Sequence, residues 1–321
     1  MTHRARRGFT LVELLVVTGL MAGLLGLALT IGRPRPGRAQ VGQTLQGLSS
    51  AVIQTQTRAL GRDAGAAILL EPGTNDMPSY ACNAVFSADV PPFITGTVTS
   101  GMPPSTLNSG TASVVLSSPD NGSATDLQQG YRIRFSGTAP TIPTSPWFGF
   151  TSPDVTMRSD AGQSVDNIVW PRAASGGVLG YEVARRPLKS VPLVKPLRAA
   201  AIDLRYSGVG DTGTGDYASL ANKGSIAICF DREGRLDAVM QDGTTAQPLT
   251  PTAPLYLLVA TFTDIQDGRS LQSPASRWLA IAPSTGRVSI AANVTVAGTT
   301  PADIAAARAN ARTGITQGVG R

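Results

Sequence analysis

The most apolar stretch of the chain lies near its amino terminus. It runs from Phe9 to Ile31, and Glu13 is its one charged residue. As a helix rising about 1.5 Å per residue, this stretch would be about 34 Å long, which is more than the roughly 30 Å of a bilayer's hydrocarbon core. The pattern therefore predicts a transmembrane helix over residues 9–31.

A second helix is predicted after a break. Two prolines and two glycines between residues 32 and 37 should interrupt or end the first helix, because proline lacks a backbone N–H and fits poorly inside a helix. Apolar residues then recur at helical spacing between Ala39 and Leu60, at Val41, Leu45, Leu48 and Val52. This stripe predicts an amphipathic helix that packs on a sheet of its own chain, so residues 32–62 are assigned to a linker and this helix.

The remainder of the chain carries strand and turn patterns. Ala66–Leu70 is the first predicted strand. The stretch from Glu71 to about Ala174 is rich in Ser, Thr, Gly and Pro, which predicts long loops with short strands at Ser113–Leu116 and Tyr131–Ser136. Strand patterns are denser from Gly180 onward, at Tyr181–Arg185, Ala201–Tyr206, Ser225–Phe230, Leu236–Met240, Leu255–Phe262 and Trp278–Ile281.

Two glycine-containing turns predict how some of these strands are connected. Asp231–Gly234 and Pro283–Gly286 each separate alternating runs and predict a hairpin.

Pro301–Arg312 predicts a short Ala-rich helix, followed by a mobile tail, so residues 301–321 form a separate terminal segment. The predicted fold is α+β, with an N-terminal transmembrane helix and an amphipathic helix packed on an antiparallel β-sheet or β-sandwich globular domain over residues 63–300.

Composition and charge narrow the function classes. The formal net charge is +6, and without Arg4, Arg6 and Arg7 the 27 Lys and Arg residues become 24 against 21 acids, a charge of +3. No basic run is interleaved with aromatic residues, so no nucleic-acid partner is expected. The single histidine is His3, and the chain after it has no triad base and no histidine metal ligand. We therefore expect no enzyme, no catalytic residue, no metal site and no cofactor.

The two cysteines leave two alternatives open. Cys82 and Cys229 are far apart in the sequence, and an envelope location permits a disulfide between them. The alternative is a pair of buried free thiols, because sequence spacing does not report distance in the fold.

Few acidic residues form a recognisable pattern. Asp211, Asp216 and Tyr217 lie in a glycine-rich loop that could in principle bind calcium, but their spacing does not match an EF-hand, and a solvated hairpin loop is expected. Asp203 and Glu182 fall within strand patterns, and the sequence assigns neither of them a partner.

The start of the chain carries a specific motif. The basic residues Arg6 and Arg7 precede Gly8, and the sequence continues as F-T-L-V-E-L-L from Phe9. This stretch resembles the class III leader of type IV pilins and type II secretion pseudopilins, in which Gly8, Phe9 and Glu13 match the pattern. The resemblance covers about the first thirty residues. It implies that residues 1–8 are a leader peptide, that a prepilin peptidase cleaves after Gly8, and that the amine of Phe9 is methylated.

Glu13 gives this resemblance a physical meaning. A carboxylate inside a bilayer core costs about 2.5–3.5 kcal/mol on insertion scales, and the apolar segment holds no Lys or Arg to pair with it. In the family its partner is the N-terminal amine of a neighbouring subunit. The resemblance therefore implies that Glu13 and the Phe9 amine set the register between subunits. It also argues against a tip subunit, which in the family lacks this carboxylate.

The globular part adds a weaker resemblance. A helix, an Arg-Ala-Leu-Gly-Arg turn ending at Arg62 and an apolar strand look like the start of an H-type minor pseudopilin. The resemblance implies a minor structural subunit of a type II secretion pseudopilus or type IV pilus. Its partners would be other pilin or pseudopilin subunits, the prepilin peptidase and an inner-membrane assembly platform. The implied location is single-pass in the inner membrane, with the globular domain in the periplasm or in an envelope-spanning filament. The alternative is a signal-anchored periplasmic ligand-binding protein outside any filament.

Overall fold

The computed structural model describes residues 11–31, 36–73, 77–100, 111–113, 115–116, 119–120, 130–137, 144–150, 156–159, 179–194, 199–214, 217–242 and 248–316. The helices are α1 (Leu11–Ile31), α2 (Pro36–Ala59), α3 (Phe262–Gln266), α4 (Pro301–Ala307) and α5 (Ala309–Thr316). The strands are β1 (Ala66–Pro72), β2 (Ala81–Asp89), β3 (Ile94–Ser100), β4 (Thr111–Ser113), β5 (Val115–Leu116), β6 (Arg132–Gly137), β7 (Phe148–Phe150), β8 (Thr156–Ser159), β9 (Leu179–Ala184), β10 (Leu188–Val194), β11 (Ala200–Val209), β12 (Ile226–Phe230), β13 (Leu236–Gln241), β14 (Leu255–Thr261), β15 (Arg277–Ile281) and β16 (Val288–Ala292).

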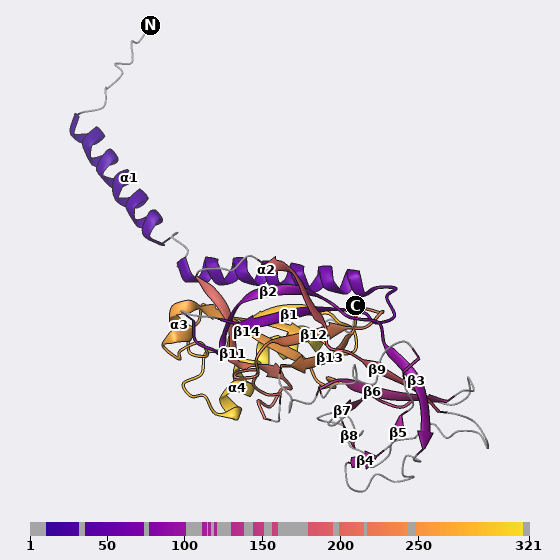
Figure 1. The fold of residues 1–321 in the computed structure, drawn as a ribbon. Coiled ribbons are helices and arrows are strands. Elements are labelled where there is room, and N and C mark those ends of the chain that lie inside the picture. Colours follow the sequence, from indigo (N-terminus) through magenta and orange to yellow (C-terminus); the bar gives the residue numbers. More distant parts are fainter. Residues whose placement is uncertain are drawn as a thin grey trace.

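The larger sheet mixes strands from both ends of the chain. Within the described residues it contains nine strands, in the order β13-β12-β1-β2-β11-β14-β15-β16, with β10 paired to β2 beside β11. Its strand pairs are antiparallel. The first two strands therefore lie in the middle of the sheet, between strands that come from the second half of the sequence (Figure 1).

Helix α2 lies along one face of this sheet (Figure 1). The predicted stripe is confirmed, since four of its side chains are at most 1% exposed: Val41, Leu45, Leu48 and Val52. They join one apolar core with residues of β1, β11, β14 and β15. The opposite face of α2 carries mainly Gln, Ser and Thr. Its spacing of apolar residues thus determines both the helix and the face that packs on the sheet.

The other face of the sheet is covered by the carboxyl-terminal helices. Residues of α4 and α5, among them Ile304 and Ile315, pack with Tyr256 and Trp278 from β14 and β15. The predicted single helix over 301–312 is in fact two helices that meet at Arg308. This arginine is 1% exposed because its side chain turns inward and donates to backbone carbonyls of the sheet and an adjoining loop.

The smaller sheet has seven strands among the described residues, in the order β4-β8-β7-β6-β9-β3-β5. Arg132 of β6 joins it to the larger sheet through an ion pair with Asp237, at 2.8 Å. The predicted strand Ser113–Leu116 is divided, because β4 pairs with β8 whereas β5 pairs with β3. Strands β2, β3, β7, β8 and β10 were not predicted, because glycine, proline and small polar residues interrupt the apolar alternation that would have marked them.

The two predicted hairpins are confirmed. β12 pairs with β13 across the turn at Gly234, and β15 pairs with β16 across the turn at Gly286. Both glycines adopt positive φ, +77° and +65°. The turns also touch each other, since a Cβ on Gly286 would lie 2.1 Å from the carbonyl oxygen of Gly234. Glycine is therefore required at 286 for both backbone conformation and space.

The predicted fold class and location are wrong. The chain is mainly antiparallel β-sheet in two sheets, rather than a pilin-like α+β domain behind a transmembrane helix. Among the described residues no helix is long and apolar enough to cross a membrane. This finding contradicts the transmembrane helix over 9–31 and the single-pass inner-membrane location.

Candidate assembly interface

Helix α1 presents apolar side chains on all of its sides. Successive residues of an α-helix point about 100° apart, so four in a row cover the whole circumference. Leu14, Leu15, Val16 and Val17 are such a run, and each is between 47% and 65% exposed. Leu11 at the start of the helix is 80% exposed. In Figure 1, α1 extends away from the two sheets, with no other element beside it.

This arrangement points to a surface that another molecule covers. Soluble proteins rarely expose contiguous apolar patches of this kind unless the patch is an interaction site. A helix that is apolar all round is normally buried, because it has no polar side to turn to water. The described part of α1 is therefore the strongest candidate functional surface of the chain.

The predicted processing residues cannot be placed on this surface. Gly8 and Phe9 lie outside the described residues. Glu13 belongs to α1, and its side chain is outside the described part of the helix. The cleavage, the methylation and the pairing of Glu13 therefore stay predictions that rest on the sequence motif.

The two cysteines are buried free thiols, so the second of the two alternatives holds and no disulfide joins them. Cys82 of β2 belongs to the core beneath α2. Cys229 of β12 lies opposite Ala67 and belongs to a cluster on the other face of the sheet. Burial raises the pKa of each thiol to about 12, so both stay protonated at neutral pH.

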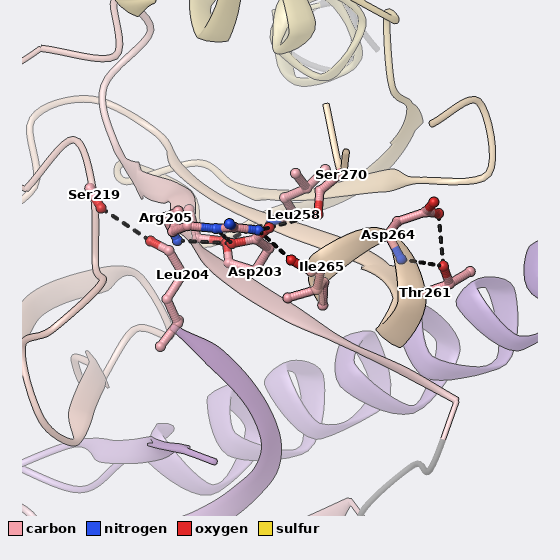
Figure 2. Close-up of polar contacts among 10 residues, drawn as sticks. Asp203, Leu204, Arg205, Ser219, Leu258, Thr261, Asp264, Ile265 and Ser270 are labelled. Carbon is pink, nitrogen blue, oxygen red and sulfur yellow. Dashed lines mark hydrogen bonds and ion pairs between the residues drawn. The ribbon is translucent and has the colours of Figure 1, made fainter. Parts of the chain in front are cut away.

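Asp203 is part of a buried polar network (Figure 2). Arg205 binds both of its carboxylate oxygens, with Nε 3.0 Å from Oδ1 and Nη2 2.7 Å from Oδ2, and the hydroxyl of Ser270 donates to Oδ2 at 2.6 Å. Arg205 Nη2 also donates to the carbonyl of Ile265, which ties β11 to α3. Burial lowers the pKa of Arg205, but its hydrogen bond and attraction to Asp203 raise that pKa by more. The network satisfies a buried carboxylate and fixes structure.

The remaining acidic candidates also have structural partners. Glu182 pairs with Arg134 on the neighbouring strand of the smaller sheet. Asp211 accepts a hydrogen bond from the hydroxyl of Tyr256, and Asp216 lies outside the described residues. Where side chains are described, no group of three or more His, Cys, Asp or Glu residues could hold a metal ion.

Sequence analysis missed the role of Arg308. Its Nη2 donates to the carbonyl of Tyr206 at 2.6 Å and to that of Ala218 at 3.3 Å, and its Nη1 donates to the carbonyl of Gly210. Burial lowers its pKa to about 10, so the guanidinium remains charged at neutral pH. An arginine within an Ala-rich helix pattern gives no sign that it will face inward. Its position could not be found without the structure.

Comparison with known proteins gives no further assignment, since no family model, no curated protein and no solved structure matches this chain.

Proposed function

We propose that this protein is a minor structural subunit of a type II secretion pseudopilus or a type IV pilus, assembled through its N-terminal helix. The observation that carries the proposal is the exposure of apolar side chains around the described part of α1. Helices of neighbouring subunits would cover these side chains and remove them from water. Burial of apolar area contributes about 25 cal/mol per Å², which makes such packing a strong driving force for association.

The leader motif supports the same function. A prepilin peptidase would cleave between Gly8 and Phe9 and methylate the new amine. Once α1 is packed among other helices, the carboxylate of Glu13 would need a partner, because an unpaired buried charge is costly. The amine of Phe9 on a neighbouring subunit would supply the opposite charge. Other pilin or pseudopilin subunits, the peptidase and an assembly platform would then be the partners.

The substitution Glu13→Leu tests the proposal. The peptidase cuts between Gly8 and Phe9, so cleavage should be normal, whereas incorporation should be lost because the neighbour's amine would be buried unpaired. The measurement is the amount of the protein that co-purifies with sheared filaments from cells that carry only the variant. Glu13→Asp is the matched control, since it retains the carboxylate and should retain more incorporation than the Leu variant. Normal incorporation of the Leu variant would contradict the role of Glu13.

Processing has its own test. The mature chain should begin at Phe9, as measured by its intact mass. Gly8→Val should block cleavage, because a branched side chain crowds the site where the peptidase accepts glycine. A mature terminus beyond Ile31 would remove α1 from the mature protein and with it the proposed assembly surface.

A further inference from the structure

The larger sheet ends at β16, where α5 packs against the strand and Asn310 bonds one carbonyl, but no other described strand pairs along the edge. Within the described residues β16 ends the order of strands, and its outer side has no strand partner. Its sequence is Val-Ser-Ile-Ala-Ala, without charge or proline, and its register with β15 is regular from Ala292 to Val288. Natural edge strands are usually protected by lysine, proline or a bulge, because an open row of N–H and C=O groups invites another strand to pair.

The other edges of this sheet are protected. Strand β10 contains Lys189 and Pro192, and its register with β2 shifts on both sides of Pro192. Strand β13 is followed by a segment that returns to it, where Leu249 and Val239 form an isolated bridge with hydrogen bonds of 2.9 Å in both directions. Strand β16 therefore lacks the features that hinder pairing with another strand at β10 and β13.

The backbone groups that face outward from β16 can be identified. Arg287 accepts from the N–H of Ala282, and the N–H of Asn293 donates to Ser276, so both residues bond toward β15. Residues of an antiparallel strand alternate between the two sides. The N–H and C=O groups of Val288, Ile290 and Ala292 therefore point away from the sheet. In agreement, the outward carbonyl of Ala292 accepts a long bond of 3.4 Å from Asn310 Nδ2.

We propose that β16 pairs antiparallel with β16 of a second copy of this chain, with Ile290 opposite Ile290. The outward groups are placed symmetrically about this residue, so the register sets Val288 of each copy opposite Ala292 of the other. Each outward N–H then meets an outward C=O. The partner's Val288 N–H takes the place of Asn310 at the carbonyl of Ala292.

Charge and side-chain packing favour a second copy as the occupant. No charged residue lies within the strand, and in this register Arg287 falls opposite Asn293, so no like charges meet. Ile290 is 48% exposed and lies beside Leu279 on the face of the sheet that α2 covers. Directly opposite apolar side chains in an antiparallel pair stabilise it. The contact uses the same surface on both copies, so it closes as a dimer. It does not depend on α1 or on the proposed function.

Cross-linking of Ile290→Cys tests the proposed pair. The full chain, kept dispersed in a mild nonionic detergent that covers α1, is treated with a short bis-maleimide. Opposite residues in an antiparallel pair have Cα atoms about 4.5–5.5 Å apart, well within reach of the reagent. Cys82 and Cys229 should stay silent, because they are buried and burial raises the pKa of each thiol to about 12. The expected main product has twice the mass of the chain.

Ile53→Cys is the matched control. Ile53 lies on the outer face of α2 and is 52% exposed, close to the exposure of Ile290, so the two thiols should be similarly accessible. The control should give only background dimer. A dimer yield from Ile290→Cys no higher than that from Ile53→Cys would overturn the proposal.

A proline variant tests whether proximity at residue 290 comes from strand pairing. Ala292→Pro removes an outward N–H and leaves the bonds between β16 and β15 intact, which is the setting in which edge strands tolerate proline. Added to Ile290→Cys, it should reduce the dimer to the level of the Ile53→Cys control. Undiminished cross-linking in the double variant would show that another contact brings the copies together.

Discussion

Helices α1 and α2 follow each other in the chain and have similar lengths, 21 and 24 residues, yet they have opposite environments. The described residues of α1 are exposed on every side, whereas α2 buries one stripe at no more than 1% exposure and turns a mainly polar face outward. The spacing of apolar residues explains the difference. A helix with one apolar stripe can be satisfied by its own sheet, whereas a helix that is apolar all round needs cover from outside the chain.

The largest test of this contrast replaces one leucine in each helix. Leu48→Ala should lower the free energy of unfolding by about 2–5 kcal/mol, because it leaves a cavity in a packed core. Leu14→Ala, on exposed α1, should change it by less than about 0.5 kcal/mol. The free energies of unfolding of the parent and the two variants are measured by urea unfolding in the same nonionic detergent. Equal losses would mean that α1 packs on the sheets as α2 does.

A thiol beneath α2 should respond to pH differently from a thiol on α1. The pKa of Cys82 is raised to about 12 in the folded state, from an ordinary value of 9.0. The unfolded state therefore loses its proton first, and stability falls as the pH approaches and passes 9.0. By pH 9.5 this one thiol should cost about 1 kcal/mol relative to pH 7.

The measurement compares the loss of stability between pH 7 and pH 9.5 in the parent chain, in Cys82→Ala and in Leu14→Cys. Cys82→Ala should lose about 1 kcal/mol less than the parent, because it lacks the group whose pKa is shifted. Leu14→Cys should match the parent, since an exposed thiol has the same pKa in both states. Identical losses in all three chains would contradict the burial of Cys82.

Polar residues of α2 should also differ by face. Gln56 donates from Nε2 to the carbonyl of Gly286 and joins the helix to the turn between β15 and β16. Gln56→Ala should therefore reduce the free energy of unfolding by about 0.5–1.5 kcal/mol. Gln54→Ala, at an exposed position two residues earlier, is the matched control and should be neutral. A neutral Gln56→Ala would show that the bond to the turn contributes nothing.

The smallest expected effect is that of a reductant. Cys82 and Cys229 are free and lie on opposite faces of the sheet, so no bond between them is available to break. The melting temperature of the chain should be the same with and without dithiothreitol. A lower melting temperature in dithiothreitol would require a disulfide, if two titratable thiols were also missing from the denatured chain in the absence of reductant.

Local patterns predicted the elements in which neighbouring residues decide the structure. The stripe from Val41 to Val52 identified α2 and its buried face, and the turns at Gly234 and Gly286 identified two hairpins. The pair of Asp203 and Arg205 could also have been found, because residues i and i+2 of a strand share a face.

Long-range features could not be predicted in this way. The sequence around Arg132 and Arg308 does not indicate that these guanidinium groups are buried against residues far away in the chain. The division into two sheets depends on pairings among strands whose local patterns are similar or weak, such as β3 with β9. The apolar run from Phe9 predicted a membrane helix, since composition alone does not identify what covers an apolar helix.

The interleaved order of the larger sheet has a consequence during synthesis. β1 and β2 leave the ribosome early, but their neighbours β12 and β11 are made only after residue 200. The buried stripe of α2 can meet β1 early, but its contacts on β14 and β15 wait longer still, because these strands lie between residues 255 and 281. Pairings so distant in sequence slow folding. A nascent chain of this protein must therefore keep its first apolar segments shielded until most of the polypeptide has been translated.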